Sequence, residues 1–162
     1  MTLRNVEQLE RELKDAFKNR ALIYWAIYDE LRTELGAERA KTLLARAIRR
    51  RGEAAGNALF RNTPADPQAI GQRFLDVSPA DGRLFPTTVT CDDRGGMHIH
   101  VQICPLKEAW EESGLPAADM ATICKIAGHF DNGVFENRGV KFSADTWTEG
   151  RSGCCHLHLE RA

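Results

Sequence analysis

The spacing of apolar side chains predicts that the first third of the chain is helical. Apolar residues recur every three or four positions in three segments before residue 61, which is typical of amphipathic helices. The first two helices are expected to be separated at Asn19-Arg20, and Gly36 suits the end of the second. A third helix is expected over residues 38–60. The three apolar stripes are Val6, Leu9, Leu13, Ala16 and Phe17; Tyr24, Ile27, Tyr28, Leu31 and Leu35; and Ala40, Leu43, Leu44, Ala47, Ile48, Ala55 and Leu59.

Two glycines lie one turn apart near the end of the third predicted helix, at Gly52 and Gly56. A glycine inside a helix costs about 1 kcal/mol relative to alanine, so its presence calls for a reason. We expect these glycines to let another element approach the helix backbone closely. Space for a ligand is the alternative explanation.

The second half of the chain alternates strand and helix patterns. Asp131-Asn132-Gly133 is expected to interrupt its last helix, and turn residues over 92–96 indicate a hairpin. The predicted elements are a short helix over 67–75, strands over 87–91, 96–104, 140–144 and 153–160, and helices over 106–113 and 116–130. The fold class is therefore α+β, with N-terminal helices packed on a C-terminal antiparallel sheet with inserted helices. We expect a single domain over residues 1–162, with a helical half over 1–61 and a sheet-rich half over 84–162.

Two of the predicted strands carry most of the histidines and cysteines. Successive side chains of a strand point to opposite faces, so each strand has an apolar and a polar face. The apolar faces are Met97, Ile99, Val101 and Ile103 in one strand and Cys155, Leu157 and Leu159 in the other. The polar faces are His98, His100, Gln102 and Cys104, and Cys154, His156 and His158. Because the alternation matches, we expect both strands in one antiparallel sheet with their apolar faces buried together.

Composition narrows the class of protein. The chain has 162 residues, of which 43% are hydrophobic and 28% charged, as in globular domains. Its formal net charge of −1 favours neither nucleic acid nor an acidic membrane as a partner. No apolar run approaches the roughly 20 residues of a membrane span, and the first residues lack a signal-peptide core. We therefore expect a cytoplasmic protein whose five cysteines are all free thiols, with its oligomeric state undetermined.

Several short segments occur in an order and spacing that resemble a known family. In the second half they are Cys104-Pro105-Leu106-Lys107-Glu108-Ala109-Trp110, Gly114-Leu115-Pro116, Asp131 with Phe135-Glu136, and Gly153-Cys154-Cys155-His156-Leu157. In the first half they are Tyr28-Asp29-Glu30-Leu31, Leu35-Gly36 and Arg51-Gly52-Glu53-Ala54-Ala55-Gly56. Together they resemble the L-2-amino-thiazoline-4-carboxylic acid hydrolase family over most of the chain. The resemblance implies a hydrolase without a cofactor that opens a small cyclic isothiourea toward carbamoyl-cysteine, on a route to cysteine.

The resemblance and the chemistry together suggest catalytic residues. Opening a 2-aminothiazoline requires a nucleophile at the carbon between nitrogen and sulfur, and a thiolate is a strong one. Cys155 and Cys104 are the candidate thiols, and a water activated by a base is the alternative. Asp131 or Glu136 could pair with the protonated amidine. We expect the chosen thiol and carboxylate to share a pocket between the helical half and the sheet.

Each of these residues also has a structural explanation. Cys155 shares a face with leucines and would serve as a small buried hydrophobe, and Cys104 and Cys124 could likewise be packing residues. One arginine of Arg49-Arg50-Arg51 could hold the ring carboxylate, although three successive basic residues on a helix also suit a solvated face. Asp131 and Glu136 follow a predicted helix end, where acidic residues are common in turns.

The strand histidines favour a second hypothesis. A His-x-His pattern directs two imidazoles to the same side of a strand, as metal sites require. The candidate ligands are His98, His100, His156 and His158, with Cys104 or Cys154 as a thiolate. The polar face could equally be solvated or covered by a helix. A third hypothesis is a non-catalytic domain that binds a small molecule or a partner.

Overall fold

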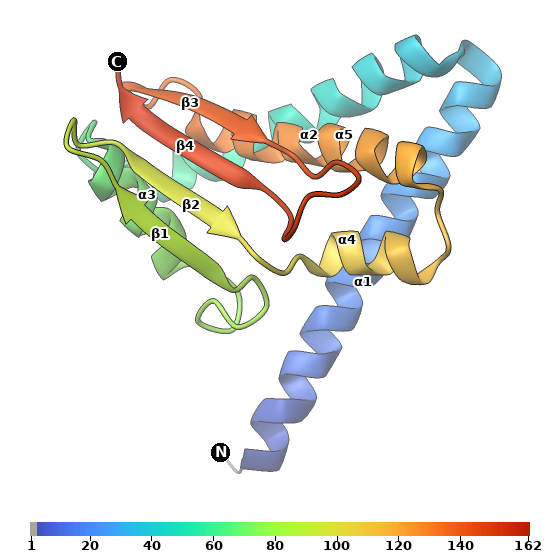
Figure 1. The fold of residues 1–162 in the computed structure, drawn as a ribbon, viewed down its shortest axis with the longest axis horizontal. Coiled ribbons are helices and arrows are strands. Elements are labelled where there is room, and N and C mark those ends of the chain that lie inside the picture. The colour runs from blue at the N-terminus through green and yellow to red at the C-terminus, as the bar shows by residue number, and fades with distance from the viewer. Residues whose placement is uncertain (1–2) are drawn as a thin grey trace.

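The computed structural model describes residues 3–162, with side chains from residue 5 onward, so residues 1–2 of the predicted helical half lie outside it. Within that range the chain forms five helices and one four-stranded sheet, and the predicted α+β class is confirmed (Figure 1). The helices are α1 (Leu3–Leu35), α2 (Ala37–Leu59), α3 (Pro67–Asp76), α4 (Pro105–Glu112) and α5 (Ala117–Phe135). The strands are β1 (Thr87–Cys91), β2 (Met97–Val101), β3 (Val140–Asp145) and β4 (His156–Arg161). None of the helices described is long and apolar enough to cross a membrane.

Helix α1 is continuous, so the predicted break at Asn19-Arg20 is wrong. Contacts with α4 stabilise the helix across this point. The indole Nε1 of Trp110 donates a hydrogen bond to the carbonyl oxygen of Ala21 at 2.8 Å, and Lys18 pairs with Glu112 at 2.6 Å. Tertiary contacts thus override a locally weak helical pattern. Beyond α4, the N-terminal part of α1 extends away from the sheet (Figure 1).

The sheet has the strand order β1-β2-β4-β3, and all neighbouring strands are antiparallel. Ile99 lies opposite Leu157 in the two central strands, which confirms the predicted pairing. Ile99, Leu157 and Leu159 are at most 2% exposed and pack together against α3 and α5. The predicted alternation fails at the end of β2. Val101, the last residue of β2, packs into a different cluster, and Ile103, two residues further on, is 45% exposed.

Glycines allow α2 and α5 to pack with their backbones in contact. A Cβ atom on Gly52 or Gly56 of α2, or on Gly133 of α5, would lie 2.1 Å from a carbonyl oxygen of the facing helix. The prediction that Gly52 and Gly56 admit another element is confirmed. The prediction that Asp131-Asn132-Gly133 interrupts the last helix is wrong, because Gly133 serves this close contact inside a continuous α5.

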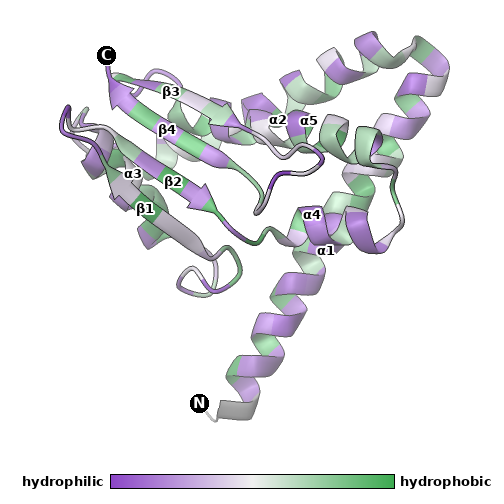
Figure 2. Ribbon diagram, in the orientation of Figure 1, coloured by the Kyte–Doolittle hydropathy of each residue, from purple (hydrophilic) through white to green (hydrophobic). Residues whose placement is uncertain are grey.

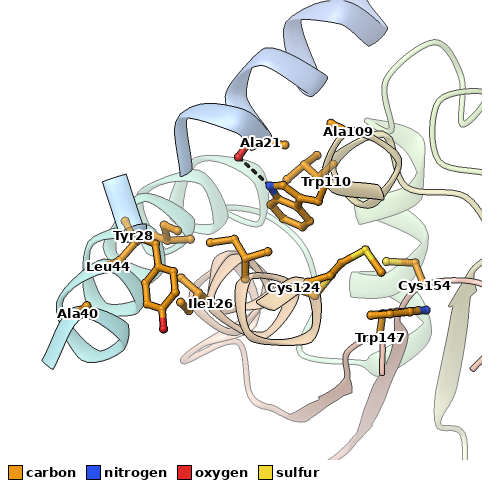
Figure 3. Packing of buried hydrophobic residues seen from close by; sticks show 14 residues of the cluster. Ala21, Tyr28, Ala40, Leu44, Ala109, Trp110, Cys124, Ile126, Trp147 and Cys154 are labelled. Atoms are coloured by element: carbon orange, nitrogen blue, oxygen red, sulfur yellow. Dashed lines mark hydrogen bonds between the residues drawn. The ribbon is translucent and has the colours of Figure 1, made fainter. Parts of the chain in front are cut away.

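Buried side chains form two clusters that meet at α5, whose apolar character is visible along most of its length (Figure 2). The first cluster lies among α1, α2, α4 and α5 and includes Tyr28, Trp110 and Trp147 (Figure 3). The second lies between the sheet and α3 and α5, and includes Ile70 and Phe135. Because α5 contributes to both clusters, its position fixes the sheet relative to the first two helices.

We predict that Gly56→Ala destabilises the fold. The added methyl group would collide with the Val134 carbonyl oxygen on rigid backbone, and overpacking of this kind costs about 1–3 kcal/mol. The higher helix propensity of alanine offsets only about 1 kcal/mol of this cost. Urea unfolding measures the loss. Gly128→Ala is the control, since its methyl group would meet only the side-chain methyl of Thr146, and an equal loss in both variants would contradict the prediction.

Candidate active site

Cys104 lies at the junction of β2 and α4, where it is the N-cap residue of α4. Its carbonyl oxygen accepts a hydrogen bond from the Glu108 N–H at 3.0 Å, which begins the helix. The pKa of the Cys104 thiol lies below its ordinary value because of its interaction with the neighbouring Cys154 thiol, with a smaller contribution from the backbone N–H groups of Lys107 and Leu106 at the start of α4. A helix N-terminus stabilises a thiolate in this way.

Cys154 and Cys155 lie just before β4, with their Sγ atoms 3.4 Å apart. The prediction that Cys154 shares the polar face of the histidines is wrong. Gly153 has φ 74°, so the strand alternation begins only at His156. Cys154 is instead 2% exposed in the first cluster beside Trp147 (Figure 3), and Cys155 is partly buried against both clusters.

All five cysteines are free, as predicted, and three of them differ in how readily they ionise. Hydrogen bonds to Cys104 and Cys155 raise the pKa of Cys154. Burial raises the pKa of Cys124, and the neighbouring Cys155 and Cys104 raise it further. Of Cys104, Cys124 and Cys154, only Cys104 has a lowered pKa, so it is the thiol of these three that ionises most readily.

Asp131 lies on the face of α5 that carries Cys124, two helical turns further along. Burial raises the pKa of this carboxyl to about 7, and the positive charge of Arg20 from α1 opposes the rise. The charge of Asp131 in turn raises the pKa of Cys104, which shows that the two groups lie within electrostatic range. A carboxyl with a pKa near neutrality can both donate and accept a proton during a reaction.

Glu136 lies apart from this group, in an ion pair with Arg49. The Arg49 Nε donates to Glu136 Oε2 at 2.9 Å, and this hydrogen bond lowers the pKa of Glu136. Arg49, Arg50 and Arg51 are all exposed on α2. Cys104, Cys154 and Cys155 thus lie near one another, and Asp131 acts on Cys104 through its charge, whereas Glu136 and the three arginines lie elsewhere.

Sequence reasoning did not single out Arg20, whose charge acts on the candidate residue Asp131. Its guanidinium lies 4.5 Å from the centre of the Phe17 ring and 6.0 Å from that of Tyr24, and its charge acts on Asp131. The only signal in the sequence was a basic residue at the expected break between two helices, which indicated a surface position.

The four strand histidines form two cross-strand pairs on the open face of the sheet. His98 Nδ1 lies 2.9 Å from His158 Nδ1, and the rings of His100 and His156 stack with their centres 4.0 Å apart. His98 Nε2 also lies 3.2 Å from Asp92 Oδ2. Among residues 3–162, no group of three or more His, Cys, Asp or Glu side chains is arranged to hold a metal ion.

Surface grooves are found elsewhere, along α2. One of about 490 Å³ lies between α2 and α5 and one of about 480 Å³ lies on α2 alone. Neither is lined by Cys104, Cys155 or Asp131, so they do not correspond to the predicted pocket. We place the candidate site at the thiols, because neither groove is lined by a cysteine.

Fold and site together describe a small α+β protein in which a cysteine with a lowered pKa stands at the N-cap of a helix and a carboxyl with a raised pKa acts on it through its charge. The family model of L-2-amino-thiazoline-4-carboxylic acid hydrolase matches residues 16–159, and the chain belongs to this family. The match includes Cys104, Asp131 and Cys155 and begins at Ala16, in the middle of α1. A search of curated proteins finds no match.

We predict that Cys154→Ala raises the pH at which Cys104 becomes reactive. The variant loses the hydrogen bond that is the main cause of the lowered pKa, and a hydrogen bond to a charged group corresponds to about one to two pH units. Alkylation of Cys104 by iodoacetamide across a pH series, followed by mass spectrometry of its peptide, measures the midpoint. Cys91→Ala, on the edge strand β1, should leave the midpoint unchanged.

We predict a pH-dependent stabilisation by Asp131→Asn. Above about pH 4 the unfolded wild type ionises this carboxyl while the folded protein holds it protonated, so wild-type stability falls until the pH passes the folded pKa of about 7. The amide does not titrate. The unfolding free energy of the variant minus that of the wild type should therefore increase by up to about 4 kcal/mol from pH 4 to pH 8. Glu136→Gln should show the opposite trend, because the pKa of Glu136 is lowered.

Proposed function

We propose that this protein hydrolyses a small cyclic amidine or isothiourea, such as 2-amino-thiazoline-4-carboxylate, to a carbamoyl-cysteine, with Cys104 as the nucleophile. The observation that carries the proposal is the position of Cys104 at the N-terminus of α4, with a lowered pKa and within electrostatic range of Asp131. Membership of the family supports hydrolysis as the class of reaction. The product would feed a route to cysteine.

In the first step, the Cys104 thiolate attacks the carbon between the ring nitrogen and the ring sulfur. Protonated Asp131 gives its proton to the ring nitrogen, which makes this carbon more electrophilic, and the resulting carboxylate pairs with the amidinium. The new bond joins Cys104 Sγ to the carbon. The carbon–sulfur bond of the ring then breaks, and the leaving thiolate takes a proton from solvent.

In the second step, water attacks the same carbon, now held on Cys104. The Asp131 carboxylate accepts a proton from this water. Breaking the bond between the carbon and Cys104 Sγ releases the urea group of a carbamoyl-cysteine and restores the thiolate, and one proton returns to solvent to balance the proton taken up in the first step. One water molecule is consumed, and neither step requires an oxidant, a reductant or a metal.

Arg20 and Cys155 have supporting roles in this scheme. The Arg20 guanidinium suits the ring carboxylate, because a planar fork of donors matches two carboxylate oxygens. Its charge acts on Asp131, which supports this role. Cys155 is the alternative nucleophile, since its Sγ lies 3.4 Å from that of Cys154, the residue that donates to Cys104.

Single serine variants test which thiol reacts. Cys104→Ser keeps the size of the side chain and removes the thiolate, so we predict a loss of kcat by more than a hundredfold with a much smaller change in KM. Cys155→Ser should retain most of the turnover of 2-amino-thiazoline-4-carboxylate, and Cys91→Ser is the control for thiol loss on the surface. The reverse order of effects would assign the reaction to Cys155. Full turnover in both variants would eliminate thiol catalysis and leave water activated by Asp131.

Arg20→Ala separates binding from chemistry in the same assay. The substitution should raise the KM for 2-amino-thiazoline-4-carboxylate. It should have little effect on the KM for 2-aminothiazoline, which lacks the carboxylate. An equal effect on both substrates would contradict the role of Arg20.

A further inference from the structure

Helix α1 exposes an unusual share of the apolar surface. Of the nine large hydrophobic side chains exposed in the described part of the chain, six lie on this helix. Four of them are Leu9, Leu13, Ile23 and Ile27, which are 49%, 38%, 48% and 43% exposed. Figure 2 shows apolar residues recurring along α1, including the part that extends past α4.

These side chains form a single line along the helix. Together with exposed Ala16 and Arg20 they follow an alternating spacing of four and three residues, which is the heptad spacing of a coiled-coil seam. We call these six residues the α1 stripe. The residues of α1 that pack into the core, such as Ala21 and Tyr28, lie on a different side of the helix. The α1 stripe is therefore additional to the apolar face that folds the protein.

The α1 stripes of two copies are complementary when the two helices run antiparallel. If a second α1 lies antiparallel with residue 18 of both helices at the centre, the stripe positions face one another in pairs, as a twofold interface requires. The facing pairs are Leu9 with Ile27, Leu13 with Ile23, and Ala16 with Arg20. Every large apolar residue then meets another, and the long arginine meets the small alanine.

We propose that the α1 stripe is the interface of a homodimer in which the α1 helices of two copies pack antiparallel. The paired segment runs from Leu9 to Ile27, or about 27 Å at 1.5 Å per residue. Opposite Arg20, the small Ala16 of the second copy lets the guanidinium keep its place over the Phe17 and Tyr24 rings, and Glu12 of that copy lies one turn away with the opposite charge. Position, size and charge thus agree on one register.

Charge argues for a protein partner rather than a lipid surface. Helix α1 carries seven acidic and six basic residues, whereas helices that lie on anionic membranes concentrate lysine and arginine on the polar face.

The α1 stripe begins before Ala16, where the family match starts. Its first two leucines, Leu9 and Leu13, therefore belong to a segment outside that match.

Two single substitutions and one control test the interface by measuring mass with sedimentation equilibrium. The wild type should have twice the mass of one chain at micromolar concentration. Leu13→Glu and Ile23→Lys should each weaken dimerisation by more than tenfold, because each places a charge in an apolar layer. Leu22→Glu is the matched control, since Leu22 is 42% exposed on the same helix but off the stripe, and it should remain a dimer.

The double variant Leu13→Glu/Ile23→Lys tests the orientation. In the antiparallel register, the introduced carboxylate at position 13 faces the introduced ammonium at position 23 of the other copy, so dimerisation should recover. In a parallel register, like charges would face one another and the double variant would be the weakest dimer. Circular dichroism of each variant checks that α1 remains helical. The mass of the wild type tests dimerisation by itself, even if a variant fails to fold.

Three results would overturn the proposal. They are a monomeric wild type, equal weakening by Leu22→Glu and Leu13→Glu, and failure of the double variant to recover. A monomeric wild type that pelleted with phosphatidylglycerol vesicles would assign the stripe to lipid instead. Turnover of 2-amino-thiazoline-4-carboxylate is no readout in this test, so its result is independent of the proposed function.

Discussion

The contact between the backbones of α2 and α5 is the constraint on which the rest of the structure depends. Gly52, Gly56 and Gly133 bring carbonyl groups of one helix to the positions that side chains would occupy on the other. Helix α5 thereby sits deep enough to pack against the first cluster on one side and the sheet on the other. The depth of α5 also fixes Asp131, because this residue is two positions from Gly133. Burial of the carboxyl follows from how closely two helices pack.

The pKa values of the two titratable groups in the candidate site, Cys104 and Asp131, are shifted in opposite directions. Hydrogen-bond donors converge on Cys104 and favour its ionised form, whereas Asp131 has no comparable donors to offset its burial. The pKa of the thiol is thus lowered while that of the carboxyl is raised. The raised pKa of Asp131 reduces the stability of the fold above neutral pH, because the carboxylate form is less well solvated in the folded protein than in the unfolded chain. Titratable groups with strongly shifted pKa values are commonly found at functional sites.

Much of the fold could be predicted from local patterns. The pairing of β2 and β4 followed from alternation around Ile99 and Leu157, and the close helix contact followed from glycines placed one turn apart. The errors have a common physical cause. Asn19-Arg20 and Asp131-Asn132-Gly133 are locally weak in a helix, but contacts with α4 and α2 stabilise the helix there, and periodicity does not contain those contacts.

The candidate site was predictable only in part, for a related reason. Cys104 and Asp131 were found through residue type and family resemblance, and the fold brings them within electrostatic range. Glu136 was misplaced because its partner Arg49 is 87 residues away in the sequence, and side-chain pairing over that distance leaves no local signal. Arg20 was overlooked because its role depends on where α1 passes the end of α5. The sequence thus predicted which side chains are reactive better than it predicted which side chains lie next to them in the fold.

His156, on the central strand β4, makes the middle of the sheet sensitive to acid. Burial lowers the pKa of His156, and the neighbouring His100 lowers it further, so the unfolded chain takes up this proton first as the pH falls below about 6.5. Strands β2 and β4 are the central ones, and each belongs to a separate antiparallel pair, β1 with β2 and β3 with β4. The stability that His156 contributes is therefore lost on acidification at the junction between these two pairs.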